Sequence, residues 1–520
     1  MPGLFLDPDS METRGRLVRV AWVDGVITDV RPEDSSMTGS ATDIDLDGRW
    51  LLPAFCESHA HLVYGSVRRR MIDLTVESPE GIAEHLSTRL DANWVLGAGW
   101  REEAYPDGGV GRADLRAAID RAPESLCFFW STDHHRALIS RASARRLGLD
   151  ASSTSTSVLL EEGDAFAAWE QIPLRSESIA EEMRDWLRHG VSSVSTFDRD
   201  ASLRAVLAME DRGELPLRVN HSIPLETLLT SGLEPRLPTL HSSPSSRPGI
   251  AVPWVKIFLD GTLGSQSAWL FEEYTDRPGW LGRGLLDDET RAAALSTIAR
   301  SGLGVAIHAI GDRAVHEAAR FILDLRARRR GELDVIDRIE HAELLRPELI
   351  ELLARERICA SVQPCHLLSD AALAPRRWGI ERCRYVLPLR SLSRAGVAIC
   401  FGTDAPVETR DPWVNLRAAV DRRPRGARDA WQAEERLDWP TAVRAATFGA
   451  AECNRLPRSW GRVVPGAPAD LQVLEAPCDW TEIESIDGAR WRATAVGGRW
   501  FADSSAEPFD ALADGTMRLD

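Results

Sequence analysis

Short apolar runs alternate with helical stretches through the middle of this 520-residue chain. The runs have the length of single strands, whereas the stretches between them are longer and have helical spacing. Such alternation predicts parallel strands covered by helices, arranged as a closed barrel or as an open sheet. The runs include VPWVKIFL, LGVAIHAIG, VIDRIEHAE, ICASVQP and VAICFGTDAP, and the helical stretches include DETRAAALSTIARSG and DRAVHEAARFILDLRARRR.

Polar residues that can bind a metal stand at the carboxyl ends of these runs. His59 and His61 occupy positions i and i+2 of one candidate strand, so both side chains point to the same side. His308 and His341 end two further runs, and Asp404 follows a third. In a barrel the carboxyl ends of the strands meet at one face, where active sites are built. The sequence therefore predicts a site at that face.

The spacing of these residues fits an eight-stranded barrel. The interval from His308 to His341 has room for one strand-helix unit. The interval from His341 to Asp404 has room for two, with ICASVQP as the strand between. Counting back places the histidine pair on strand 1, Lys256 on strand 4, His308 on strand 5, His341 on strand 6 and Asp404 on strand 8.

Lys256 is the only lysine among 62 basic Lys and Arg residues, and it lies inside the apolar run WVKIFL. A buried lysine can lose its proton, whereas arginine stays protonated. The neutral amine can capture CO2, and the resulting carbamate is an anionic oxygen ligand that can bridge two metal ions. The alternative is a lysine whose stem packs in the core while its ammonium group reaches water.

Four imidazoles, one carboxylate and one carbamate can hold two divalent ions. Nitrogen and oxygen donors of this kind suit Zn2+ first, with Mn2+, Fe2+ or Co2+ as alternatives. A single His-x-His pair is a weak signal for a metal site. Five elements in barrel order, each on a candidate strand, are a much stronger one.

The two ends of the chain have a different pattern from the middle. Residues 17–30 predict two strands around the turn Asp24-Gly25, and short strands recur near the other end. We expect residues 1–52 and 451–502 to form one small β-sandwich domain, followed by a tail at 503–520. The barrel should span 53–450, with a large insertion between about 62 and 250 that forms part of the pocket wall.

The bulk composition is that of a soluble globular protein. The net charge of -17 argues against a nucleic-acid footprint, which would be basic. The N-terminus lacks the long apolar core of a signal peptide, and no run is long enough for a transmembrane helix. The eight cysteines include no CxxC pair, a pattern typical of reduced thiols in a cytoplasm.

These motifs resemble those of the amidohydrolase superfamily, whose fold is a distorted TIM (β/α)8 barrel with an attached β-sandwich. More narrowly, they are similar to the branch that contains the N-substituted formamide deformylases, amidohydrolase family 3. The resemblance runs from about residue 17 to 502. It is carried by WVKIFLDGTLGSQSAWL, VAIHAIGDRAV, RIEHAE, SVQPCHL and FGTDAPVE.

The resemblance implies a role for each candidate ligand. His59 and His61 would bind one ion, His308 and His341 the other, and carboxylated Lys256 would bridge them. A hydroxide formed between the ions would attack a carbonyl group, and Asp404 would bind metal and pass the proton to the leaving nitrogen. We assign catalysis to Asp404, His341 and His135, the last because it matches a family histidine that reaches the pocket.

Four further residues are candidates for substrate contact or for orienting the ligands. Asp260 begins the loop after strand 4, Asp312 follows His308, and Gln363 and His366 follow strand 7. For all four, and for His135, the alternative is ordinary loop and cap chemistry.

We therefore expect a cytoplasmic, metal-dependent hydrolase of the C–N bond of a small non-peptide amide or N-acyl compound. One alternative is hydrolysis of an ester, lactone or cyclic amide, or deamination, at the same centre. Another is a non-catalytic barrel scaffold, against which the intact ligand set argues. The family resemblance also implies a homodimer; nothing indicates a membrane or nucleic-acid partner.

Overall fold

The structure, a computed structural model, contains two compact units. One is built from residues 1–62 together with 180–520, and the other from 63–179. The described residues are 3–5, 17–32, 44, 46, 49–88, 94–101, 109–131, 136–149, 155–231, 247–329, 336–454, 456–475, 490–503 and 517–519.

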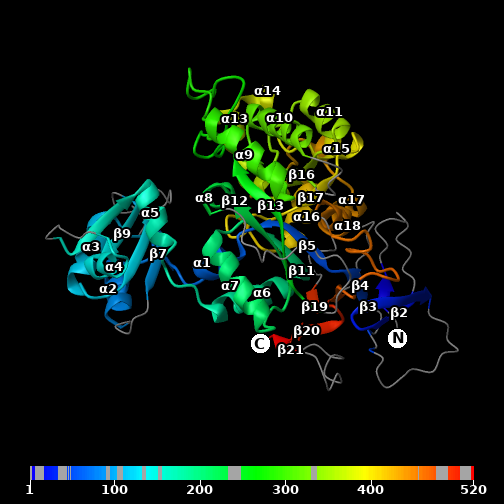
Figure 1. The fold of residues 1–520 in the computed structure, drawn as a ribbon, viewed down its shortest axis with the longest axis horizontal. Coiled ribbons are helices and arrows are strands. Elements are labelled where there is room, and N and C mark those ends of the chain that lie inside the picture. Colours follow the sequence, from blue (N-terminus) through cyan, green and yellow to red (C-terminus); the bar gives the residue numbers. More distant parts are fainter. Residues whose placement is uncertain are drawn as a thin grey trace. The chain divides into compact units, whose positions relative to one another are not determined.

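Eight parallel strands form a barrel in the larger unit (Figure 1). They follow one another in chain order, so the predicted fold class is confirmed, and His59, Lys256 and His308 lie on strands 1, 4 and 5 as expected. Nearly every residue of these strands is buried, because helices cover a parallel sheet on its outer face. The strands are β5 (Phe55–Ala60), β11 (Val191–Thr196), β12 (Arg218–Pro224), β13 (Ile250–Phe258), β14 (Gly304–Ala309), β15 (Arg338–His341), β16 (Cys359–Val362) and β17 (Ile399–Phe401).

The barrel closes where the end of β17 meets β5. Ala60 and Ala405 form a parallel bridge. The backbone N–H of Asp404 donates to the carbonyl oxygen of His59 at 2.7 Å, and that of His61 donates to Ala405 at 2.8 Å. Closure therefore brings Asp404 beside the two histidines of the first strand.

Helices follow the barrel strands, and their ends carry the expected signals. The side chain of Asp287 caps α9 by accepting from the N–H of Thr290, and Gly302 ends that helix with a φ of 75°. Helix α10 buries one apolar face that includes Val315, Phe321 and Ile322. The helices of this unit are α6 (Ser176–Leu187), α7 (Asp200–Asp211), α8 (Leu225–Ser231), α9 (Asp288–Ser301), α10 (Asp312–Arg328), α11 (Pro347–Arg355), η1 (Pro364–His366), α12 (Leu367–Asp370), α13 (Ala374–Arg377), α14 (Ile380–Cys383), α15 (Leu389–Arg394), α16 (Pro412–Asp421), η2 (Ala433–Glu435), α17 (Trp439–Ala446) and α18 (Phe448–Cys453).

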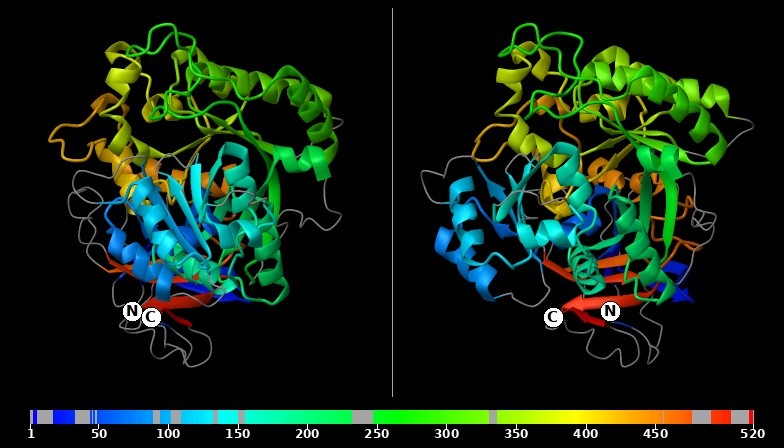
Figure 2. Two further views of the ribbon diagram at one scale, coloured as in Figure 1. Left: turned by 90° about the vertical axis from the view of Figure 1, so that its left-hand side faces the viewer. Right: turned by 60° about the vertical axis from the view of Figure 1, so that its left-hand side comes forward.

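A second sheet is built from both ends of the chain, and its blue and red strands lie side by side in Figures 1 and 2. Its N-terminal hairpin turns at Asp24 and Gly25, both at positive φ as a tight two-residue turn requires. Antiparallel pairing of Leu471 with Pro53 joins the two halves. The order is β21 (Met517–Leu519), β20 (Arg499–Asp503), β19 (Arg490–Val496), β18 (Leu471–Glu475), β4 (Trp50–Pro53), β1 (Gly3–Phe5), β2 (Leu17–Val23) and β3 (Val26–Pro32).

Residues 63–179 form a unit with its own sheet and apolar cores. It lies in the chain between barrel strands 1 and 2, whereas β11 and β12 come after it. Its strands, in sheet order, are β10 (Ser157–Glu161), β9 (Arg136–Ser140), β8 (Cys127–Ser131), β7 (Val95–Trp100) and β6 (Ile72–Asp73). Its helices are α1 (Leu62–Arg68), α2 (Pro79–Thr88), α3 (Arg112–Arg121), α4 (Arg141–Arg146) and α5 (Glu162–Trp169). Within the described part of the chain, no helix is both long enough and apolar enough to span a bilayer.

Candidate metal centre

Asp404 lies against both histidines of the first strand. Its Oδ1 is 3.2 Å from Nε2 of His61 and 3.5 Å from Nε2 of His59. One donor atom from each of the three residues falls within 4.8 Å of the other two. The backbone of Asp404 has a φ of 58°, an uncommon conformation for a residue other than glycine and one found often at functional sites.

The second oxygen of Asp404 faces another pair of histidines. Oδ2 is 3.5 Å from Nε2 of His366, and His341, His366 and Asp404 also place their donor atoms within 4.8 Å. The rings of His341 and His366 stack with centroids 5.8 Å apart. Asp404 is therefore shared between two groups of possible ligands.

A buried hydrogen bond with Glu340 fixes the ring of His59. Nδ1 of His59 lies 2.6 Å from Oε2 of Glu340, so this nitrogen carries the proton. Burial and the charge of Lys256 hold the pKa of His59 well below its usual value, which keeps the ring neutral. Nε2 of His59 consequently presents a lone pair toward Asp404.

The residues present fit a divalent cation. Nε2 of His59 and Oδ1 of Asp404 both act as acceptors, and two acceptors that face each other are stabilised by a cation between them. Within the described residues, the buried Oδ1 of Asp404 and Nδ1 of His341 make no hydrogen bond, although buried polar atoms are normally paired. Burial opposes ionisation of Asp404, but His366 and His61 outweigh it and hold the pKa of the carboxyl well below its usual value.

Lys256 is buried beside two aromatic rings. Its Nζ lies 4.5 Å from the ring centre of Phe197 and 4.8 Å from that of Phe258. Burial lowers the pKa of Lys256 to about 8, against the opposing attraction of Glu340 and Asp404. Among the described residues, none forms a hydrogen bond or ion pair with Nζ. A neutral amine is therefore accessible near neutral pH, as carbamate formation requires.

The ring of His308 packs against the histidine cluster, but its Nε2 atom points away from it. The rings of His308 and His341 have centroids 4.5 Å apart. Nε2 of His308 lies 3.2 Å from the carbonyl oxygen of Gly261 and so donates its proton away from Asp404. Burial and the charge of Lys256 lower the pKa of His308 to about 3, so the ring is neutral and only Nδ1 has a lone pair to offer a metal.

The family model described as the amidohydrolase family matches residues 43–501. The chain belongs to this family. LONG AFTER FAR-RED 3 of Arabidopsis thaliana is 28% identical over 533 residues, 94% of this chain and 88% of the relative. The putative amidohydrolase YtcJ of Bacillus subtilis (strain 168) is 26% identical over 504 residues, 89% of this chain and 92% of the relative.

A solved structure resembles this amidohydrolase over most of its length. It is an uncharacterized metal-dependent hydrolase from Pyrococcus furiosus, with a TM-score of 0.72, 26% identity and coverage of 88% of this chain and 94% of the other. This similarity, the family match and a site whose residues suit a divalent cation together show that the protein is a metal-dependent enzyme of the amidohydrolase family.

Two of the predicted supporting carboxylates fasten loops of this amidohydrolase. Asp260 accepts the N–H groups of Trp269 at 2.8 Å, Ile310 at 3.1 Å and Gly311 at 2.9 Å, which ties the loops after β13 and β14 together. Asp312 accepts from the N–H of Phe271 at 3.0 Å and pairs with Arg346 at 2.8 Å. The contacts of Asp312 are of the loop kind that the sequence left as the alternative, whereas Oδ1 of Asp260 also lies 3.6 Å from Nε2 of the candidate ligand His308.

The remaining predicted residues differ in their proximity to the cluster. His366 lies against Asp404, as described above. Gln363 is buried and donates weakly to the carbonyl oxygen of Ser361 at 3.4 Å. His135 lies outside the described residues.

Sequence reasoning missed the two glutamates that support the centre. Glu340 was seen only as part of the motif RIEHAE. Glu57 accepts from the N–H of His59 and from that of Thr403, both at 2.8 Å. It therefore links the first strand to the segment that leads into Asp404. The signal available for both was an acidic residue within an otherwise apolar strand, where an unpaired charge is costly.

Proposed function

We propose that this amidohydrolase binds two divalent ions, Zn2+ foremost, and hydrolyses the C–N bond of a small non-peptide amide or N-acyl compound. The observation that carries the proposal is the approach of His59 Nε2 to Asp404 Oδ1 at 3.5 Å, because both atoms are acceptors. The family match over residues 43–501 supports the reaction class.

The ligands divide into two sets around Asp404. His59 and His61 would hold one ion, and His341 with Nδ1 of His308 would hold the other. Carboxylated Lys256 would bridge the two. His366 contacts Asp404 from the side of Oδ2 and would keep the carboxylate oriented.

Bound ions of this kind lower the pKa of water and polarise a carbonyl group. Asp404 accepts the proton of the attacking water and delivers it to the leaving nitrogen. Its low pKa keeps the carboxyl group ionised, which is the form that accepts a proton. Because Asp404 is buried and held between imidazoles, the proton is transferred from a fixed position rather than from a mobile side chain.

Metal content and the state of Lys256 test the centre directly. Metal-free protein is loaded with Zn2+ with and without bicarbonate, and bound zinc per chain is measured by elemental analysis. We expect two ions with bicarbonate, and fewer in Lys256→Ala or in the better-packed Lys256→Met. Because Lys256 is the only lysine, the mass of one CO2 on a lysine identifies this residue. One ion in parent and variants alike would show that Lys256 does not bridge.

A substrate panel then tests the reaction class. Zinc-loaded protein is assayed on N-acyl compounds, cyclic amides, esters and lactones, with Asp404→Asn as the inactive control. Turnover of N-acyl compounds is the expected result. Turnover of esters alone would replace the C–N assignment, and a fully loaded protein inert to the whole panel would favour a scaffold.

A further inference from the structure

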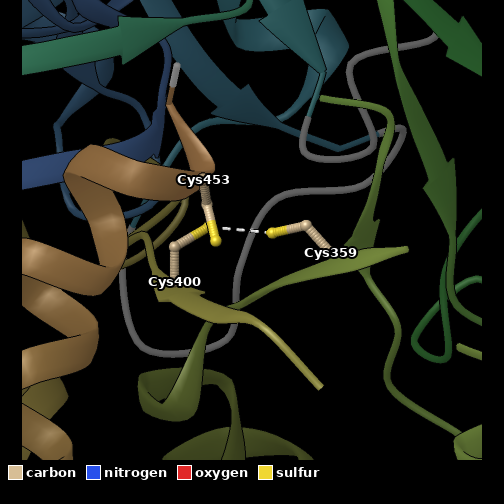
Figure 3. A group of neighbouring side chains, drawn as sticks. All are labelled: Cys359, Cys400 and Cys453. Carbon is tan, nitrogen blue, oxygen red and sulfur yellow. Dashed lines mark hydrogen bonds between the residues drawn. The ribbon is translucent and has the colours of Figure 1, made fainter. Parts of the chain in front are cut away.

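Three cysteines from separate elements form a group that includes none of the histidines of the metal centre. Cys359 begins β16, Cys400 lies in β17 and Cys453 ends α18. Figure 3 shows the three side chains pointing toward one another from these separate elements. All three are buried, with at most 3% of their surface exposed. This group could not be predicted from the sequence, because the three residues are far apart along the chain and form no CxxC pair.

The spacing of the sulfurs matches one shared ion. The three Sγ atoms lie within 4.8 Å of one another, and those of Cys359 and Cys400 are 3.9 Å apart. Three sulfurs bound in a plane at the usual metal–sulfur length of about 2.3 Å are separated by about 4 Å. The thiols are therefore already close to the positions that a three-coordinate ion needs.

A buried positive charge stands close to the thiols. Arg338 is fully buried and donates to the side chain of Asn454, the residue that follows Cys453, at 2.5 Å. Burial opposes ionisation of all three thiols, and the positive charge of Arg338 favours the thiolate form of Cys400 and of Cys453. Thiolate, rather than thiol, is the form that binds metals.

We propose that Cys359, Cys400 and Cys453 form a site for one Cu(I) ion, independent of the hydrolytic centre. Soft thiolate ligands select Cu(I), Zn2+ or iron–sulfur clusters. Structural Zn2+ takes four ligands, whereas the described residues supply three donors here. Cys56 packs in the same apolar cluster, but its thiol lies outside the group of three sulfurs. Three sulfurs satisfy Cu(I) and leave Zn2+ short of a ligand.

The test is a Cu(I) titration of the full-length, reduced protein without oxygen, against a coloured Cu(I) chelator. We expect one Cu(I) retained per chain and an X-ray absorption spectrum with sulfur neighbours only. Cys400→Ala and Cys359→Ala should each weaken binding by more than about 100-fold, beyond the 10–100-fold typical of losing an outer partner of a metal ligand. Circular dichroism establishes that each variant is folded.

Two controls separate this site from other metal binding. Cys383→Ser should retain Cu(I), because that thiol donates to the carbonyl oxygen of Gly379 and lies outside the group. His61→Ala should also retain the copper–sulfur signal. The proposal is overturned if the parent yields all its copper to the chelator, or if nitrogen neighbours dominate the spectrum. It is equally overturned if Zn2+ displaces Cu(I), or if two of the three cysteines form a disulfide instead.

Discussion

Oε2 of Glu340 lies 2.6 Å from Nδ1 of His59, and Oε1 of the same carboxylate accepts from Arg338 at 2.5 Å. A carboxylate behind a metal-binding imidazole fixes which nitrogen is protonated and raises the basicity of the other. The position of His59 Nε2 toward Asp404 is therefore set by a pair of residues outside the proposed ligand set.

Glu340→Gln should weaken zinc binding by about 10–100-fold, the usual loss when such a partner is removed. The amide cannot supply the negative charge that holds the proton on Nδ1 of His59. Zinc affinity is measured by competition with a chelator. Glu351→Gln, an exposed change in α11, is the control and should leave the affinity unchanged. Equal affinities in both variants would show that Glu340 does not act on the metal centre.

Arg338→Met should lower the free energy of unfolding by about 3–5 kcal/mol, as expected when one partner of a buried ion pair is lost. Arg338 also donates to the carbonyl oxygen of Ser58 and to Asn454, both at 2.5 Å. Denaturant unfolding measures the change. Arg320→Met removes a 3.4 Å pair with Glu317 at the surface and should change stability by about 0–1 kcal/mol. Similar losses of unfolding free energy in the two variants would show that the buried ion pair of Arg338 stabilises the fold no more than a surface pair does.

Removal of metal should lower the thermal stability of the parent protein, and Asp404→Asn should abolish that difference. A ligand at 100 times its Kd stabilises a folded protein by about 2.7 kcal/mol. Melting curves of chelator-treated and zinc-loaded samples give the comparison. Asp429→Asn, an exposed substitution, should keep the full metal-dependent shift. A full shift in Asp404→Asn would exclude this carboxylate as a ligand.

Gly311→Ala should destabilise the fold by at least about 1–3 kcal/mol, the range typical of overpacking. A Cβ at this position would lie 2.1 Å from the carbonyl oxygen of Trp269, and Asp260 holds the backbone of both residues in place. Gly264→Ala is the matched control, since its nearest neighbour would be 4.0 Å away. Both are measured by denaturant unfolding, and a neutral Gly311→Ala would mean that the two loops move apart easily.

The alternation of strands and helices and the strand next to each candidate ligand could be predicted, because alternation and spacing are local properties. Closure into a barrel was implied by the resemblance to the amidohydrolase superfamily. It missed Glu340 for a physical reason. Neighbouring residues of a strand point to opposite faces, so Glu340 and His341 should not both serve one site. His341 has a φ of 68°, which ends that alternation. The contact of His366 with Asp404 depends on the short turn after β16, which sequence spacing does not define.

The pairing of β4 with β18 and the closure of β5 against β17 have a consequence for how the chain is made. Both early strands leave the ribosome hundreds of residues before their partners exist. Contacts of such large sequence separation form late and slowly. Until the last strands emerge, β4 and β5 present unpaired apolar edges. Synthesis of the C-terminal segment is therefore a condition for folding of the N-terminal one, and premature termination would release a chain prone to aggregate.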